Sequence, residues 1–278
     1  MANKKRSRVH PIVAAATAVP LAIAALMPKT AHTTPAPAAK IFHAPKGVAC
    51  AVNLKACPVN GCEPDGSTHA LANEMKRRIP SSVTPKTLEW DDFTTLQEDA
   101  DSTVGQDREL DASDRAKLRN INVSSGHVSE GDLVRLAGFL VDDPHDNKGE
   151  SVNCGLKGVP NNDFHIPLAN DPNSTGFDGI VVEMIPQDRP AEWSLKMLRR
   201  VERDRRMVLV TGQLFYDNLH RVRTDPEADA GGQPARFSLF EIHPVTSFEV
   251  CIDKDTQCDP TQSAKWENLE KFAKDNSK

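Results

Sequence analysis

Histidines and carboxylates recur through the second half of the sequence, in short segments whose residue types could do chemistry. The polar members of these segments are Asp163, His165, Glu183, Asp217, His220, Glu241 and His243. Imidazole and carboxylate groups bind zinc and other divalent ions, and a bound ion with an open position activates water for hydrolysis. On an exposed sheet the same side chains would instead form a binding surface. We therefore consider two classes of function, a metal-dependent enzyme and a binding module.

The metal hypothesis takes His165, His220, Glu241 and His243 as ligands of a divalent ion such as zinc. It predicts a metal-dependent hydrolase of the nuclease or phosphodiesterase type. However, no H-x-x-x-H or H-E-x-x-H motif brings two ligands together, and strands two positions apart in a sheet are separated by roughly 10 Å. In the alternative interpretation His243 binds backbone next to Pro244, and His165 lies on a half-exposed face.

The binding hypothesis assigns a ligand surface to Asp163, His165, Glu183, Tyr216 and Asp217. A barrel face with a groove and aromatic side chains can hold an oligosaccharide, a peptide or a nucleic-acid strand. The sequence lacks the G-x-S-x-G, P-loop and G-x-G-x-x-G motifs of common enzyme classes, and we assign no catalytic residue. We therefore expect a binding or structural module of unknown ligand, with the hydrolase as the alternative.

Five segments with strand patterns and one helical segment must position these residues. The predicted strands are Leu133 to Asp142, Asp163 to Leu168, Gly179 to Ile185, and two long antiparallel strands between Met207 and Val250 that a Gly231-Gly232 turn separates. The predicted helix, Ala191 to Arg203, has an apolar stripe and follows the third strand. This is the order of an OB-fold. The predicted fold class is mainly β (α+β), an OB-like five-stranded barrel with an N-terminal helical extension.

The OB order places the third strand between the second and the fifth. The polar residues of these three strands are then expected to face outward on one continuous surface, where the fold usually binds ligands. The residues are Asp163, His165, Glu183, Glu241 and His243. A bulge in the fifth strand would turn Glu241 and His243 inward.

The chain is predicted to have four parts. They are a signal peptide and stem (1–38), an N-terminal loop and helical extension (39–128), the barrel (129–252) and a tail helix (253–278). The first part has a basic start, an apolar run from Pro11 to Met27 and small residues around Ala36-Pro37-Ala38, which predicts a secreted, periplasmic or cell-envelope protein. If it stayed uncleaved, this segment would be the chain's contact with a membrane.

Three helices are predicted in the extension. They are His69 to Arg78, capped by Ser67 or Thr68, a helix that begins after Trp90 with Asp91 as its N-cap, and Asp111 to Ile121. Their apolar stripes are thin, so we expect the extension to pack on the barrel rather than to build its own core. In the tail, Trp266, Leu269 and Phe272 have helical spacing.

Six cysteines in an exported chain predict disulfides, and Cys251 with Cys258 is the favoured pair because they close a short loop. Two of the first three, Cys50, Cys57 and Cys62, are expected to join each other, which leaves one for Cys154.

The net charge of the mature chain excludes one class of partner. The charge of −5 becomes about −10 without the first part, whose charged residues are all basic. An acidic chain repels phosphate backbones, so we expect a cell-envelope protein or a small ligand as partner and no nucleic acid. The basic runs Lys76-Arg77-Arg78 and Lys196 to Arg206 are interpreted as solvated helix faces.

Several ordered motifs resemble a family of exported bacterial proteins with a predicted OB-like barrel and no assigned activity. The motifs are E-S-V-N-C (150–154), D-F-H-I (163–166), V-V-E-M-I-P (181–186), V-T-G-Q-L-F-Y-D-N-L-H (210–220) and E-I-H-P-V-T (241–246), and N-E-M-K-R-R (73–78) is similar to an N-terminal motif in some members. The D-x-H, F-Y-D-x-x-H and E-I-H-P-V patterns carry most of the resemblance, which implies the barrel and no reaction. Phe240 stands where some relatives have tryptophan.

Overall fold

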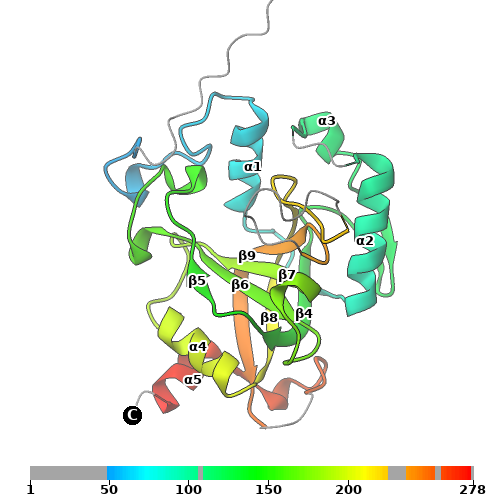
Figure 1. The fold of residues 1–278 in the computed structure, drawn as a ribbon, viewed down its shortest axis with the longest axis vertical. Helices are drawn as coiled ribbons and strands as arrows, with labels where there is room; N and C mark the ends of the chain where they lie inside the picture. The colour runs from blue at the N-terminus through cyan, green and yellow to red at the C-terminus, as the bar shows by residue number, and fades with distance from the viewer. Residues whose placement is uncertain (1–48, 106–108, 225–235, 254–257, 277–278) are drawn as a thin grey trace, which may run out of the picture. The chain divides into compact units, whose positions relative to one another are not determined.

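A closed five-stranded barrel forms the centre of the computed structural model, which describes residues 49–105, 109–224, 236–253 and 258–276 (Figure 1). Its strands are β4 (Leu133–Leu140), β6 (Phe164–Ala169), β7 (Ile180–Met184), β8 (Met207–Tyr216) and β9 (Phe240–Cys251). They are joined in the order β4-β8-β9-β7-β6, and pairing of β4 with β6 closes the ring. Strands β7 and β9 are parallel and the other neighbours antiparallel. This order confirms the predicted OB-like barrel.

Alternation of side chains along each strand fills the barrel. Phe164, Ile166 and Leu168 of β6 point into the core opposite the apolar residues of β7, because Ile166 pairs with Val182. Successive side chains of a strand point to opposite faces, so the residues between them lie on the outer face of the barrel. The polar residues of interest are among these.

Short strands extend the barrel sheet. β1 (Lys86–Thr87) pairs with β4, β5 (His145–Asp146) with β6, and β10 (Trp266–Asn268) with β9, while β2 (Ile121–Val123) and β3 (Gly126–Val128) form a separate hairpin. The expected tail helix is therefore wrong at Trp266, which lies in β10 opposite Cys251 and packs beside the Cys251–Cys258 disulfide.

Five α-helices are present in the described residues. They are α1 (Thr68–Lys76), α2 (Trp90–Thr103), α3 (Ala112–Arg115), α4 (Leu195–Arg203) and α5 (Leu269–Asp275). The hydroxyl of Ser67 caps α1, as one of the two predicted alternatives. Helix α2 starts earlier than predicted, because its N-cap is Glu89, two residues before the expected Asp91, and Glu89 forms a capping box with Asp92.

The predicted helix from Asp111 to Ile121 is wrong beyond its first turn. Asp111 caps α3, which ends at Arg115, and Ile121 begins strand β2. A right-handed helix cannot extend to Ile121, because Asn120 has a left-handed φ of 56°.

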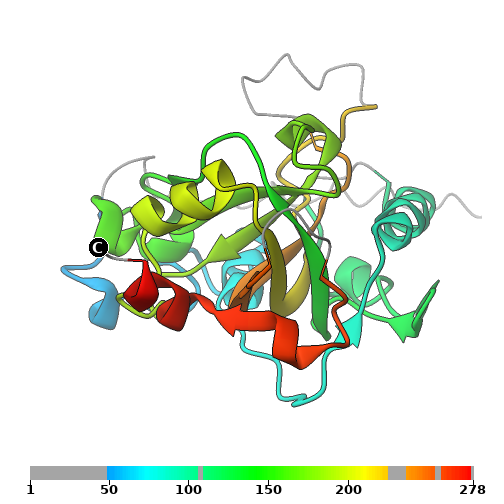
Figure 2. The same ribbon diagram turned by 90° about the horizontal axis from the view of Figure 1, so that it is seen from below.

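One hydrophobic core joins the extension to the barrel. Phe93 and Leu96 of α2 are buried in the same cluster as Val134 of β4 and Phe240 of β9, which confirms that the extension packs on the barrel. The apolar stripe of α4 is buried in this core too. Helices α4 and α5 lie side by side in both views (Figures 1 and 2), and Arg200 donates to the side chain of Asn276 across them.

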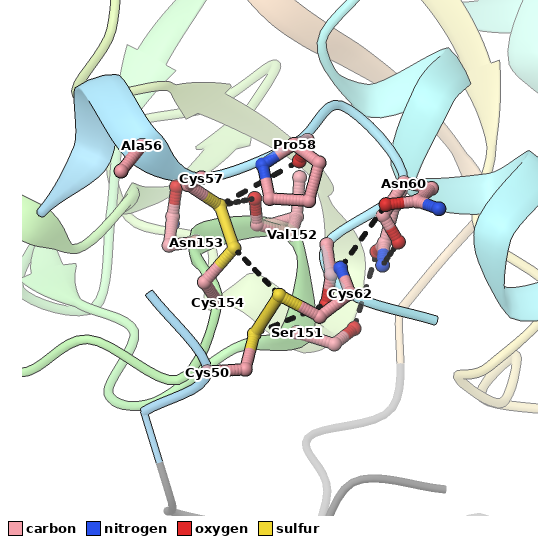
Figure 3. The surroundings of a disulfide bond; sticks show 12 residues. Cys50, Ala56, Cys57, Pro58, Asn60, Cys62, Ser151, Val152, Asn153 and Cys154 are labelled. Carbon is pink, nitrogen blue, oxygen red and sulfur yellow. Dashed lines mark hydrogen bonds between the residues drawn. A yellow bond between two sulfur atoms is a disulfide. The ribbon is translucent and has the colours of Figure 1, made fainter. Parts of the chain in front are cut away.

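Three disulfides link the chain, Cys50–Cys62, Cys57–Cys154 and Cys251–Cys258. The pairing follows the sequence-based expectation in every respect that it specified. Figure 3 shows the first two side by side, with the Sγ atoms of Cys62 and Cys154 3.5 Å apart. The Cys57–Cys154 bond ties the loop before α1 to the barrel.

The disulfides indicate an oxidising, extracellular environment. Within the described residues no helix is long and apolar enough to cross a membrane. The predicted signal segment (1–38) and the Gly231-Gly232 turn lie outside the described residues.

Candidate functional site

The outer faces of β6, β7 and β9 bring five of the candidate residues together. His165 pairs with Glu183 across β6 and β7, and Val182 pairs with Ile242, which places Glu241 and His243 beside Glu183. Asp163 immediately precedes β6 and joins the group through His243. The expectation that these residues share one face of the barrel is confirmed.

The expectation that this face is exposed is wrong. Asp163, Glu241 and His243 have no exposed surface, and Glu183 and His165 are 1% and 5% exposed. The face is covered because α1 and the segment around Asn153 lie over it. The side chain of Gln213 joins the two layers, donating to the backbone oxygens of Met75 in α1 (2.6 Å) and His243 in β9 (2.8 Å).

His243 lies at the centre of a set of charged and imidazole side chains that we call the buried polar cluster. Its Nδ1 is 3.3 Å from Glu183 Oε2 and 3.5 Å from Glu241 Oε2, and its Nε2 is 3.8 Å from Asp163 Oδ2. Around this centre lie more members. The complete cluster is Lys76, Asp163, His165, Glu183, Asp217, His220, Arg236, Glu241 and His243.

Two cations neutralise two of the four carboxylates. Lys76 Nζ lies 3.6 Å from Asp217 Oδ2, and Arg236 is hydrogen-bonded to Glu241 Oε1. His220, one turn after β8, approaches Asp217 Oδ2 with Nδ1 at 2.8 Å. These pairs leave Asp163 and Glu183 without a lysine or arginine within ion-pair distance in the part of the chain that the structure describes.

Sequence reasoning missed both cations. Lys76 was interpreted as part of a solvated face, but it is 6% exposed and its ammonium group enters the cluster. Helical spacing could have found it, because it follows the buried Ala72 by four residues. Arg236, 2% exposed, lies a few residues before β9 in sequence without strand periodicity, and no sequence signal pointed to it.

Several buried polar atoms at the centre of the cluster make no hydrogen bond with any described residue. They are Asp163 Oδ2, Glu183 Oε2, Glu241 Oε2 and both ring nitrogens of His243. A buried polar group without a partner costs about 1–3 kcal/mol, and more if it is charged. Native proteins leave few buried polar groups unpaired, so five such atoms at one point call for a physical explanation.

Burial changes the protonation of the central groups. It raises the pKa of Glu183 to about 8, with a further contribution from Glu150. Burial and the neighbouring carboxylates Glu150 and Glu183 also raise the pKa of Asp163 well above its usual range. Burial lowers the pKa of His243 well below its usual range, so this imidazole is neutral and able to act as a ligand.

Amide side chains hold the opposite oxygens of the two unneutralised carboxylates. Asn153 donates to Asp163 Oδ1 at 2.9 Å, and Asn147 donates to Glu183 Oε1 at 3.1 Å. Asn153 is fixed because it precedes Cys154 of the Cys57–Cys154 disulfide. The disulfide therefore helps to orient a carboxylate of the cluster.

The remaining predicted residues have other surroundings. His165 Nε2 accepts a hydrogen bond from Arg236 (3.2 Å), and its ring packs at a tilt on that of His145, with ring centroids 4.8 Å apart. Burial, followed by the charge of Arg236, lowers its pKa well below the usual range. Tyr216 was expected at a rim of the binding face, but it is fully buried in the barrel core against Phe240.

Apart from the disulfide-bonded Cys50, Cys62 and Cys154, two sets of the described residues have ligand atoms close enough to hold a metal ion. One is Asp163, Glu183 and His243, and the other is Asp217, His220 and Glu241, with the ligand atoms of each set within 4.8 Å of one another. Carboxylate and imidazole donors suit zinc and related divalent ions. Of the four predicted ligands, His243 and Glu241 approach each other, whereas His165 and His220 point to Arg236 and Asp217.

No protein-family model and no curated protein matches the chain. One of the solved structures to which it is similar is an OBody, AM3L15, bound to hen egg-white lysozyme. The match has 13% sequence identity and a TM-score of 0.23, and it covers 45% of this chain and 84% of the other.

Proposed function

We propose that this protein is an exported binding or structural module whose OB-like barrel uses its outer β6–β7–β9 face to dock its own N-terminal segment. The observation that carries the proposal is burial: Glu183, Glu241 and His243, on the face where OB-folds usually bind ligands, are at most 1% exposed. A polymer substrate has no access to these residues while α1 is in place. The partner, a cell-envelope protein or a small ligand, then binds other surfaces or enters the enclosed face.

Three features support the proposal that the protein is exported. The chain starts with basic and apolar segments typical of a signal peptide, it contains disulfides, and its motifs resemble those of exported bacterial proteins. The net charge supports a protein or small-molecule partner over a nucleic acid.

A metal-dependent hydrolase is the second candidate, because Asp163, Glu183 and His243 converge with partnerless atoms. A hydrolytic metal needs an open coordination position that water and substrate can reach. In this structure that would require α1 to leave the barrel. The burial of all three side chains therefore favours the module.

Two measurements on the mature, oxidised protein separate the candidates. The first is turnover of bis(p-nitrophenyl) phosphate and a chromogenic peptide with Zn²⁺, Mn²⁺ or Mg²⁺. For the module we expect background rates in wild type, Glu183→Gln and Glu130→Gln alike. Metal-dependent turnover that disappears only in Glu183→Gln would establish the hydrolase.

The second measurement is amide hydrogen exchange. If the segment is a permanent cover, the amides of α1 exchange as slowly as those of β9, through global unfolding. Exchange in α1 that is a hundredfold faster than in β9 would contradict a closed face.

A further inference from the structure

We propose that the covered face holds one divalent transition-metal ion, bound by Asp163, Glu183 and His243. The inference rests on the closed face of the proposed function and adds the chemical class of what lies beneath it. The ligands come from three neighbouring elements, the residue before β6, strand β7 and strand β9. The barrel itself therefore positions them, whereas α1 and the disulfide-linked segment cover them.

The side-chain atoms of Asp163, Glu183 and His243 that lack a hydrogen bond lie towards one another. Asp163 Oδ2 and Glu183 Oε2 are the oxygens without hydrogen bonds, while the opposite oxygens are bound by Asn153 and Asn147. Second-layer hydrogen bonds of this kind orient ligating carboxylates in metal sites. The amides thus hold each carboxylate with its partnerless oxygen towards His243.

The separations suit coordination better than hydrogen bonding. His243 Nδ1 is 3.3 Å from Glu183 Oε2, and Nε2 is 3.8 Å from Asp163 Oδ2, but neither contact meets hydrogen-bond geometry. One ion binds only one of the two ring nitrogens, and with one ligand atom from each residue the three atoms lie within 4.8 Å of one another. Ligands at about 2.0–2.1 Å from a tetrahedral zinc ion are separated from each other by about 3.3–3.4 Å. Glu241 Oε2, 3.5 Å from His243 Nδ1, is positioned as a further donor.

The charge of the site also matches a divalent cation. Asp217 and Glu241 already have Lys76 and Arg236, so within the buried polar cluster the carboxylates without a neighbouring cation are Asp163 and Glu183, and Glu150 beside them adds further negative charge. One divalent ion would balance both. Without it, burial disfavours the charged form of both carboxyls and raises the pKa of each.

The imidazole selects the class of ion. Ca²⁺ and Mg²⁺ prefer sites made only of oxygen, whereas one nitrogen and two carboxylates suit Zn²⁺ and its neighbours. The second candidate set, Asp217, His220 and Glu241, carries no proposal, because Lys76 and Arg236 already neutralise its two carboxylates and His220 is hydrogen-bonded to Asp217.

The test uses the mature, oxidised chain after dialysis against a chelator and then metal-free buffer. Zn²⁺ is titrated by calorimetry, and Co²⁺ is added separately because its visible absorption reports coordination directly. We expect about one equivalent of either ion and a Tm increase of about 5–10 °C at a hundredfold excess of Zn²⁺ over its Kd.

Glu183→Gln and Asp163→Asn each keep the shape of the side chain and remove one charged ligand. We expect at least a hundredfold weaker Zn²⁺ binding and loss of the Co²⁺ spectrum in both. The matched control is Glu130→Gln, which changes a carboxylate outside the cluster whose side chain is 3% exposed and which Arg115 neutralises. It should lower stability but keep the Zn²⁺ affinity within about threefold.

An absence of stoichiometric Zn²⁺ and Co²⁺ binding by wild type would overturn the proposal, as would equal binding by wild type and both ligand variants. In either case slow hydrogen exchange in α1 would still support the proposed binding or structural module with a closed face. Fast exchange in α1 together with retained metal binding would support the metal site and contradict the closed face.

Discussion

The ammonium nitrogen of Lys76, the last residue of α1, lies 3.6 Å from Oδ2 of Asp217, the residue after β8. The pair connects the N-terminal segment to the barrel inside the protein, since both residues are buried. Although burial alone would lower the pKa of Lys76, Asp217 and the other carboxylates raise it. Conversely, Lys76 and His220 outweigh the burial of Asp217 and lower its pKa well below the usual range.

Removal of one member of this pair should strongly destabilise the fold. In Lys76→Met, Asp217 keeps its contact with His220 but loses its buried cation, so we expect a loss of about 3–5 kcal/mol in unfolding free energy. In the double variant with Asp217→Asn the loss should be smaller than the sum of the single losses, as urea denaturation of the four proteins would show. Lys117→Met is the control, because its ion pair with Asp114 is at the surface and should change stability by less than about 0.5 kcal/mol. Additive losses in the double variant would contradict a direct interaction.

The Cys57–Cys154 disulfide should contribute more stability than Cys251–Cys258. The two bonds span 97 and 7 residues of sequence separation, and the loop-closure model gives about 4–5 and 2–3 kcal/mol respectively. Chemical denaturation of the two double Cys→Ala variants tests this difference. Equal losses would mean that native-state contacts, not loop closure, determine the effect.

Stability of the metal-free protein should fall as pH rises from about 6.5 to about 8. Burial raises the pKa of Glu183 to about 8 in the folded state, above its unfolded value of 4.5, so folding takes up a proton in this range and higher pH opposes it. His243, whose folded pKa is lowered, opposes this trend only below about pH 6.5. A difference of one bound proton between the folded and unfolded states changes the unfolding free energy by about 2 kcal/mol over this pH interval.

The pH effect has its own control. Glu183→Gln cannot take up the proton and should flatten the slope of unfolding free energy against pH, measured in urea with a chelator present. Asp114→Asn, which changes a carboxylate outside the cluster that pairs with Lys117 at the surface, should leave the fall between pH 6.5 and 8 in place. A slope that is unchanged in Glu183→Gln would assign the proton to another group.

The extension and the barrel should unfold together. Phe93 of α2 is fully buried in the core that it shares with the barrel, so Phe93→Ala should cost about 3–5 kcal/mol and still give one cooperative transition. Val83→Ala is the control at a side chain that is 94% exposed, and we expect a change below about 0.5 kcal/mol. Coincidence of circular dichroism and tryptophan fluorescence would check the single transition, and a separate early transition would contradict it.

The barrel could be predicted because the sequence patterns that indicate its strands lie within short segments of the chain. Apolar alternation in β6 and β7, and the order of three strands, one helix and two strands, limit the topology to few choices. The Cys251–Cys258 pair follows from short separation in the same way. Where local signals compete, prediction fails: Trp266 has helical spacing to Leu269 and Phe272, but backbone pairing with β9 places it in a strand.

The sequence by itself determined which polar residues share the outer face of β6, β7 and β9, since strand periodicity and strand order are enough for that. Only the tertiary structure decided that this face is closed, that Lys76 and Arg236 neutralise Asp217 and Glu241, and that Asp163 and Glu183 turn partnerless oxygens towards His243. The physical reason is that burial and pairing of charges depend on contacts between segments distant in sequence. No periodicity within a single segment records those contacts.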